Sequence, residues 1–163
     1  MLFILFSASS VTYSENISQF NGNLAPVSDH AYQLVVKGDN KHTQFSITDI
    51  ESLTLYQSNF KTKWGLEGNF VGVKLIDLLK HAGIQSFKRL LIRASNDYKT
   101  TIEISDTGIE TALVATRLNG APFELTDKGP FFILWPSLSE HVLSGEVSTA
   151  KWAWSTIEIQ KVR

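Results

Sequence analysis

The chain has 163 residues, of which 43% are hydrophobic and 19% are charged, and its formal net charge is -1. This length and composition indicate one packed globular domain and exclude a disordered chain. The balanced charge provides no basic stripe for a phosphate backbone, and the absence of cysteine excludes thiolate metal sites and cysteine nucleophiles, so nucleic-acid binding and thiol chemistry are not expected.

The N-terminal residues 1–14 have the pattern of a secretory signal. Residues 2–6 form an apolar run that is too short to span a bilayer, which takes about 20 residues. Small residues follow up to Ser14, a possible cleavage site, although only Met1 stands where a signal normally carries basic residues. We predict export to a periplasm-like compartment without stable membrane insertion, a lead-in over residues 15–30 and a folded domain over residues 31–163. The alternative is an N-terminal strand or helix buried against the domain.

The part of the chain that follows alternates polar and apolar residues, which is typical of strands. The pattern predicts strands at residues 31–37, 42–47 and 53–64, the first two joined as a hairpin by a turn at 38–41. Ser46 or Thr48 is placed to cap a short helix at 49–53, whose acidic residues would lie near its positive end.

The rest of the chain is organised around residues 68–83, with the sequence GNFVGVKLIDLLKHAG. They predict a short extended lead, a turn at Gly72 and Val73, and one amphipathic helix that Gly83 ends in the left-handed conformation. The apolar side chains expected on the buried side of the helix are Val73, Leu75, Ile76, Leu78, Leu79 and Ala82. A helix of about three turns is marginal on its own, so it must dock on the strands around it.

Strands dominate the second half of the chain as well. The pattern predicts strands at residues 88–94, 98–104, 111–117, 131–135 and 152–162, with tight turns at 95–97 and 118–120. A short turn or helix is expected at 105–110, and a polar loop with room for one helical turn at 136–150. Many strands and few helices predict a mixed, β-dominated α+β fold in a single domain.

The most conspicuous candidate binding site is the turn Asn96-Asp97-Tyr98 between two predicted strands. A carboxylate in such a turn can accept two adjacent N–H groups of a ligand, while the neighbouring aromatic ring covers the face of the ligand. The alternative is that Asp97 only satisfies backbone amides of the turn.

Tryptophan residues provide the second set of candidates. Trp64 ends a predicted strand beside a glycine loop and could wall a cleft, with Ser58 and Thr62 on the same face of that strand by the period of two. Trp135 precedes a proline, and Trp152 shares one face of the last predicted strand with Trp154. The alternative for each tryptophan is packing in the core.

The remaining residues do not require an enzyme. The histidines, at positions 30, 42, 81 and 141, have no partner at metal-ligand spacing. The chain also lacks a Gly-x-Ser-x-Gly elbow, a phosphate loop and a dinucleotide glycine fingerprint.

With these motifs in order, the chain resembles the molybdopterin-binding domain of the sulfite oxidase family over residues 31–162. The resemblance rests on GNFVGVKLIDLLKHAG, ASNDY, LNGAPFELTDKGPFFILWP and KWAWSTIEI. It implies a mixed α+β domain whose β-sheets enclose the cofactor. Catalytic members of the family present a cysteine thiolate to molybdenum from the region that corresponds to residues 58–69, and this chain has no cysteine there or elsewhere.

This departure makes the chain similar to small, cysteine-free periplasmic proteins of the same fold, which bind a free pterin. The resemblance implies a reduced pterin held non-covalently, with complete molybdopterin the less favoured ligand, and a membrane-bound partner that is a cyclic-di-GMP-metabolising enzyme or a sensor kinase. The pterin edge would be held by Asp97, with Trp64 and Tyr98 as walls and Trp135 and Trp152 as further ring contacts. The hydrogen bonding would be completed by Ser58, Thr62 and Asn96.

Two other functions remain open at this point. The chain could be a molybdenum-cofactor-dependent oxidoreductase, or a subunit of one, that lacks the usual cysteine ligand. It could also be an interaction module whose pocket is degenerate and empty.

Overall fold

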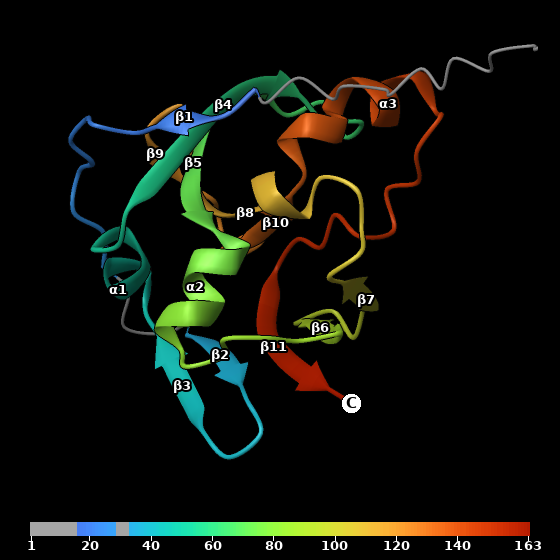
Figure 1. The fold of residues 1–163 in the computed structure, drawn as a ribbon. Coiled ribbons are helices and arrows are strands. Elements are labelled where there is room, and N and C mark those ends of the chain that lie inside the picture. The colour runs from blue at the N-terminus through green and yellow to red at the C-terminus, as the bar shows by residue number, and fades with distance from the viewer. Residues whose placement is uncertain (1–15, 29–32) are drawn as a thin grey trace, which may run out of the picture.

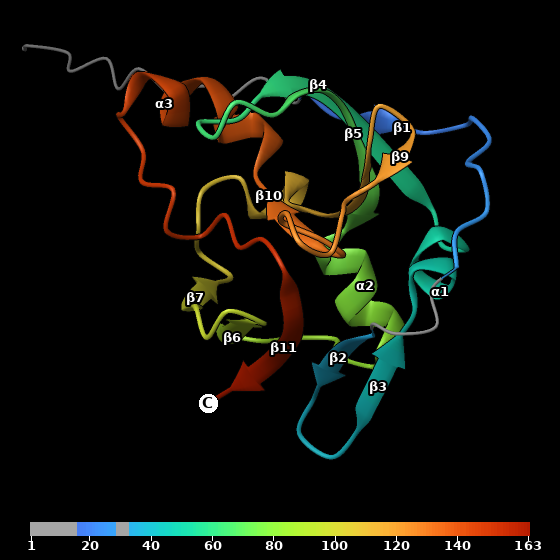
Figure 2. The same cartoon turned by 180° about the vertical axis from the view of Figure 1, so that it is seen from behind.

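The computed structural model describes residues 16–28 and 33–163, so the predicted signal over residues 1–14 lies outside the described residues. Two β-sheets form the framework of the described chain, with helix α2 (Leu75–His81) between them and helix α3 (Ser139–Ser144) at one end (Figures 1 and 2). The predicted mixed, sheet-dominated α+β fold is therefore confirmed.

The first sheet is antiparallel and has the strand order β1-β4-β5-β8-β10, with β9 paired to β8. Its strands are β1 (Ser18–Gln19), β4 (Leu55–Lys61), β5 (Glu67–Lys74), β8 (Leu113–Leu118), β9 (Ala121–Pro122) and β10 (Phe132–Leu134).

The second sheet has the order β3-β2-β11-β6-β7, in which β11 runs parallel to β2 and antiparallel to β6. Its strands are β2 (Leu34–Lys37), β3 (His42–Phe45), β6 (Arg89–Ala94), β7 (Lys99–Glu103) and β11 (Thr156–Val162). The predicted hairpins β2–β3 and β6–β7 both form. The C-terminal strand β11 lies between them and joins them into one sheet.

The central segment differs from its prediction at one point. Strand β5 continues to Lys74 and leads directly into α2, so the expected turn at Gly72 and Val73 is wrong and Val73 belongs to the strand. The reason is tertiary pairing: β5 has a partner on each side, and a Cβ atom on Gly72 would come within 2.2 Å of the Val114 carbonyl oxygen of β8. Glycine is needed there because the two backbones approach closely.

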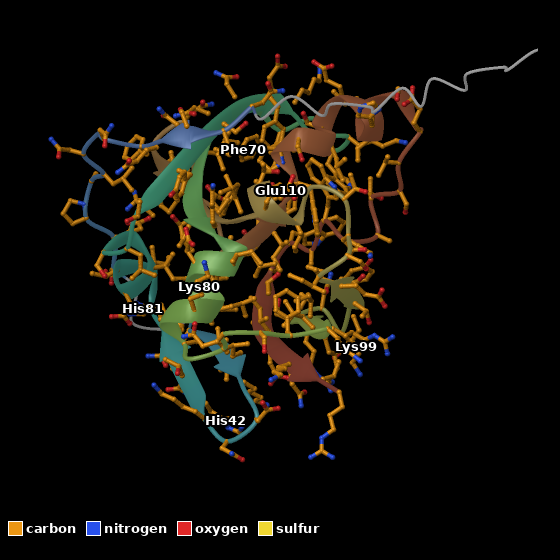
Figure 3. The ribbon with its side chains drawn as sticks, viewed as in Figure 1. His42, Phe70, Lys80, His81, Lys99 and Glu110 are labelled. Carbon is orange, nitrogen blue, oxygen red and sulfur yellow. The ribbon has the colours of Figure 1, made fainter. Side chains whose placement is uncertain are left out.

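Helix α2 docks as its pattern predicts. Leu75, Leu78 and Leu79 are fully buried, while Lys80 and His81 lie on the exposed side of the helix (Figure 3). Its apolar side rests on the core between the sheets, and this burial stabilises a helix too short to form alone. The chain leaves the helix at Gly83, whose φ of +87° confirms the predicted left-handed end.

Helix α1 (Ile47–Glu51) begins two residues earlier than predicted because Ser46, rather than Thr48, caps it. The Ser46 hydroxyl accepts a hydrogen bond from the Asp49 backbone N–H at 3.0 Å, and the Asp49 carboxylate accepts one from the Ser46 N–H at 2.8 Å. This reciprocal capping box satisfies two donors at the N-terminus that would otherwise lack partners.

The C-terminal third also departs from prediction. Strand β11 begins at Thr156, so Trp152 and Trp154 lie in the irregular segment before it and do not share a strand face. The turn at Trp152, whose N–H donates to the Thr149 carbonyl at 2.9 Å, and the positive φ of +50° at Ser155 prevent an earlier start. The predicted loop at 136–150 contains a 3₁₀ turn, η2 (Pro136–Leu138), and α3.

The lead-in is part of the fold over its described residues 16–28. Strand β1 extends the first sheet beside β4, and the Arg117 guanidinium donates to the Ala25 carbonyl at 2.7 Å. Across the described ranges 16–28 and 33–163, none of the helices has the length and apolar character that a membrane crossing requires.

Candidate functional site

Trp64 is partly buried and belongs to an aromatic cluster that packs against the core. Its ring centroid lies 4.9 Å from that of Trp154, 5.9 Å from that of Phe132 and 6.2 Å from that of Trp152. Tilted and edge-to-face pairs at these distances are the favourable geometry for aromatic packing. The structure therefore gives Trp64 a packing role against the other rings.

A pocket of about 270 Å³ lies at one end of this region, and we name it the Trp pocket. It is lined by Asp106, Thr107, Trp135, Leu138, Val147, Ser148, Ala150, Lys151 and Trp152. Trp135 and Trp152 are almost fully buried, with exposed fractions of 1% and 2%, yet both contribute atoms to the wall. The pocket therefore combines two indoles with a carboxylate, an ammonium group and two hydroxyls.

The charged groups of the Trp pocket form an ion pair. Lys151 Nζ contacts Asp106 Oδ1, and Asp106 Oδ2 accepts a hydrogen bond from the Glu103 backbone N–H at 2.7 Å. The side chain of Lys151 is 38% exposed and that of Asp106 is 18% exposed. A carboxylate offers about four lone-pair sites, so these two contacts leave Asp106 able to accept more hydrogen bonds.

The wall formed by residues 147–151, the rim segment, is fixed by side chains from outside it. The Trp135 indole N–H donates to the Lys151 carbonyl at 2.8 Å, and the Tyr98 hydroxyl donates to the Ala150 carbonyl at 2.5 Å. Within the segment, the Ala150 N–H donates to the Ser148 hydroxyl at 3.1 Å. These bonds hold the backbone on both sides of the Lys151 side chain.

The predicted turn residues lie beside this pocket without lining it. Tyr98 is 41% exposed and reaches the rim segment through its hydroxyl. Asn96 and Asp97 are exposed in the β6–β7 turn, where the Asn96 side chain accepts a hydrogen bond from the Tyr98 N–H at 3.2 Å. Asp97 has a φ of +66°, and its side chain does not line the Trp pocket.

The hydroxyls of Ser58 and Thr62, which were predicted to contact the ligand, form hydrogen bonds within the protein instead. Ser58 and Thr62 are buried, with exposed fractions of 3% and 1%. The Ser58 hydroxyl donates to the Asn16 carbonyl, and the Thr62 hydroxyl accepts from the Leu66 N–H at 3.1 Å. Both hydroxyls therefore satisfy backbone groups, and neither residue lines the Trp pocket.

The structure thus brings together Trp135, Trp152 and, at the rim, Tyr98, and it adds two residues that sequence reasoning missed. Asp106 was expected only to start a turn, and Lys151 was not considered a site residue. A signal for Lys151 was present, because it precedes Trp152 in the KWAW segment that carries the family resemblance. The signal for Asp106 was weak, since an aspartate in a turn usually serves the turn.

One further ion pair lies close to the pocket in sequence. His141 Nδ1 lies 2.7 Å from Glu146 Oε2, and this hydrogen bond together with the charge of the imidazole holds the pKa of the Glu146 carboxyl below its ordinary value. Among the residues that the structure describes, no three His, Cys, Asp or Glu side chains are grouped as a metal site would need.

Comparison with known proteins bears on the fold alone. Neither protein-family models nor curated protein sequences match the chain. Among solved structures, the chain is similar to the crystal structure of the sulfane dehydrogenase SoxCD from Paracoccus pantotrophus, with a TM-score of 0.60 and 16% sequence identity. The match covers 98% of this chain and 50% of that one, so this chain spans about half the length of the SoxCD chain that it matches.

Proposed function

We propose that this protein binds a reduced pterin non-covalently in the Trp pocket and performs no reaction on it. The observation that carries the proposal is the composition of this pocket, whose lining includes Asp106 together with Trp135 and Trp152. Its volume of about 270 Å³ is close to the lower end of small-molecule pockets, roughly 300–1,000 Å³, as a bicyclic ligand requires.

The donor set fits the chemistry of a pterin. Pterins are flat and carry an amino-pyrimidinone edge with adjacent N–H donors, which one carboxylate can accept together. Asp106 has the acceptor capacity for this, and the hydroxyls of Thr107 and Ser148 line the same pocket. The indoles of Trp135 and Trp152 supply the apolar contact area that a flat ring needs.

A non-catalytic role is favoured because the chain has no cysteine, and a hydroxyl or amide does not replace a thiolate as a soft ligand for molybdenum. If the chain carried the complete cofactor of an oxidoreductase, protein purified from a host that makes this cofactor would contain molybdenum in a one-to-one ratio. Metal analysis therefore separates the two functions, and we expect no stoichiometric molybdenum.

The binding test is isothermal calorimetry with a reduced pterin on the wild type and on two matched variants, Asp106→Asn and Asp97→Asn. We expect Asp106→Asn to weaken binding about tenfold or more, because removing one charged acceptor costs about 1.5–3 kcal/mol. Asp97→Asn is the control for loss of one nearby surface charge. If only Asp97→Asn weakens binding, the β6–β7 turn holds the ligand; if the wild type does not bind, the proposal is wrong.

We also propose that the protein works in the periplasm and reports pterin availability to a membrane-bound partner that metabolises cyclic-di-GMP or is a sensor kinase. The support is the resemblance to the cysteine-free pterin-binding proteins. The test is the affinity of this protein for the periplasmic region of a membrane protein encoded beside it, measured with and without pterin. Equal affinity in both conditions would contradict a relay.

A further inference from the structure

The Trp pocket contains a donor and an acceptor side by side. Lys151 Nζ and Asp106 Oδ1 are in direct contact, and both side chains line the pocket. Of the described residues that line it, these two are the charged ones. A ligand that reaches this end of the pocket therefore meets an ammonium group next to a carboxylate.

The complementary group is a lactam, which places a carbonyl oxygen beside an N–H. We propose, on the basis of the proposed function, that Lys151 is a specificity-determining residue that donates a hydrogen bond to the ring carbonyl of the ligand while Asp106 accepts from the neighbouring N–H. In this arrangement each charged group of the pair gains a partner of the right polarity as water is displaced. The ligand class is thereby narrowed to heterocycles with an oxo group beside a ring N–H.

An amino group in place of the carbonyl reverses the polarity at Lys151. Two sets of N–H donors then face each other, and the ammonium loses water without gaining an acceptor. A diamino ring that becomes protonated to pair with Asp106 places a second positive charge against Lys151, which is also unfavourable. In closed sites, a ligand that leaves a buried polar group unpaired binds up to about 10⁴-fold more weakly. Since Lys151 is 38% exposed, we expect the affinity for the amino analogue to be lower by roughly tenfold to a hundredfold.

The pair is held in position by contacts that do not involve a ligand. The backbone on either side of the Lys151 side chain is fixed, since its own carbonyl accepts from the Trp135 indole and the preceding carbonyl accepts from Tyr98. The Asp106 carboxylate is fixed through the Glu103 N–H. A donor and acceptor that are already oriented lose little conformational entropy on binding, which is what discrimination requires.

The experiment compares binding of a reduced pterin, called pterin below, with binding of the equally reduced 2,4-diaminopteridine, in which an amino group replaces the carbonyl at ring position 4. We expect the wild type to bind pterin at least tenfold more tightly, and Lys151→Met to bind both with the preference reduced about tenfold. Lys161→Met is the matched control, since Lys161 also forms an ion pair, with Asp39, but does not line the Trp pocket; it should keep the wild-type preference.

The outcomes distinguish this inference from the proposed function. Two outcomes would overturn the role of Lys151 and leave pterin binding intact. In the first, the wild type binds both compounds equally, a result that needs no variant. In the second, Lys151→Met keeps the wild-type preference. Failure of the wild type to bind either compound would refute the pterin proposal itself. Guanosine, which has the same lactam edge on a purine, is the third probe: tighter binding of guanosine than of pterin would refute a pterin as the ligand and support the role of Lys151.

Discussion

Two of the ion pairs that join segments distant in sequence, Arg117–Glu51 and Lys151–Asp106, differ in how completely they are enclosed. Arg117 on β8 is 1% exposed and pairs with Glu51 through two hydrogen bonds, Nε to Oε1 at 2.7 Å and Nη2 to Oε2 at 2.8 Å. The same guanidinium donates to the Ala25 and Gly120 carbonyls. Lys151 has Asp106 as its ion-pair partner and remains 38% exposed at the wall of a pocket.

The difference separates a charged group that holds the fold together from a pair that lines the Trp pocket. The Arg117 guanidinium donates hydrogen bonds to Ala25 in the lead-in, to Glu51 in α1 and to Gly120 in the turn before β9, so it holds these parts together. The Lys151–Asp106 pair keeps donor and acceptor capacity, lines the Trp pocket and is partly exposed. A buried pair that is fully satisfied indicates structure, whereas a partly open pair beside a pocket indicates binding.

Breaking the enclosed pair should have the largest effect. Arg117→Met leaves the Glu51 carboxylate, 12% exposed, without its guanidinium, and we expect the free energy of unfolding to fall by about 3–5 kcal/mol. Urea denaturation measures this change. Arg89→Met is the control, because Arg89 pairs with Glu103 at the surface, where such pairs contribute about 0–1 kcal/mol. Similar losses in both variants would contradict the distinction between enclosed and exposed pairs.

A ligand bound in the Trp pocket should stabilise the protein whether or not the enclosed Arg117–Glu51 pair is intact. Pterin at a hundredfold excess over its dissociation constant should raise the free energy of unfolding by about 2.7 kcal/mol in the wild type. Arg117→Met, if folded, should gain the same increment, because distant sites without shared partners are additive within about 0.5 kcal/mol. Thermal unfolding with and without pterin tests this. If pterin does not stabilise Arg117→Met, the two regions are energetically coupled and the comparison between them fails.

The hydrogen bond that holds the rim segment should have a smaller effect. Tyr98→Phe removes the hydroxyl that donates to the Ala150 carbonyl, and we expect a loss of about 0.5–1.5 kcal/mol in stability. Pterin affinity should fall with it, because the rim segment is less well oriented. Calorimetry on the same variant is the check, and unchanged affinity would show that the ligand does not depend on the rim.

The smallest effect is expected at the exposed His141–Glu146 pair. Because the pKa of Glu146 is lowered in the folded protein, mainly by the hydrogen bond from His141, its contribution to stability is present above the ordinary glutamate pKa, about 4.3. It is lost as the pH falls through the lowered value. Glu146→Gln should therefore be slightly less stable than the wild type near neutral pH and equally stable in strong acid. A constant difference in melting temperature across this range would contradict the assignment.

The sequence by itself determined most of the longer strands, the central helix and the class of fold, whereas the short strands β1 and β9 and the length of β5 were not predicted. Alternation marks the strands, Ser46 and Asp49 carry the capping box in four adjacent residues, and Gly83 marks the end of α2. The missing thiol is also a property of the sequence, and it disfavours molybdenum ligation without any coordinates. These features could be predicted because each depends on residues close together in the chain.

Only the tertiary structure decided which carboxylate faces the Trp pocket. Asp97 and Asp106 stand at the two ends of the same strand, β7, and both are aspartates in turns. Asp106 meets Lys151, 45 positions further along the chain. The pairing of β11 with β6 and of β6 with β7 brings the segment before β11 to the start of β7, where the Tyr98 hydroxyl contacts it. Local patterns do not contain that register, which depends on pairings across the whole chain.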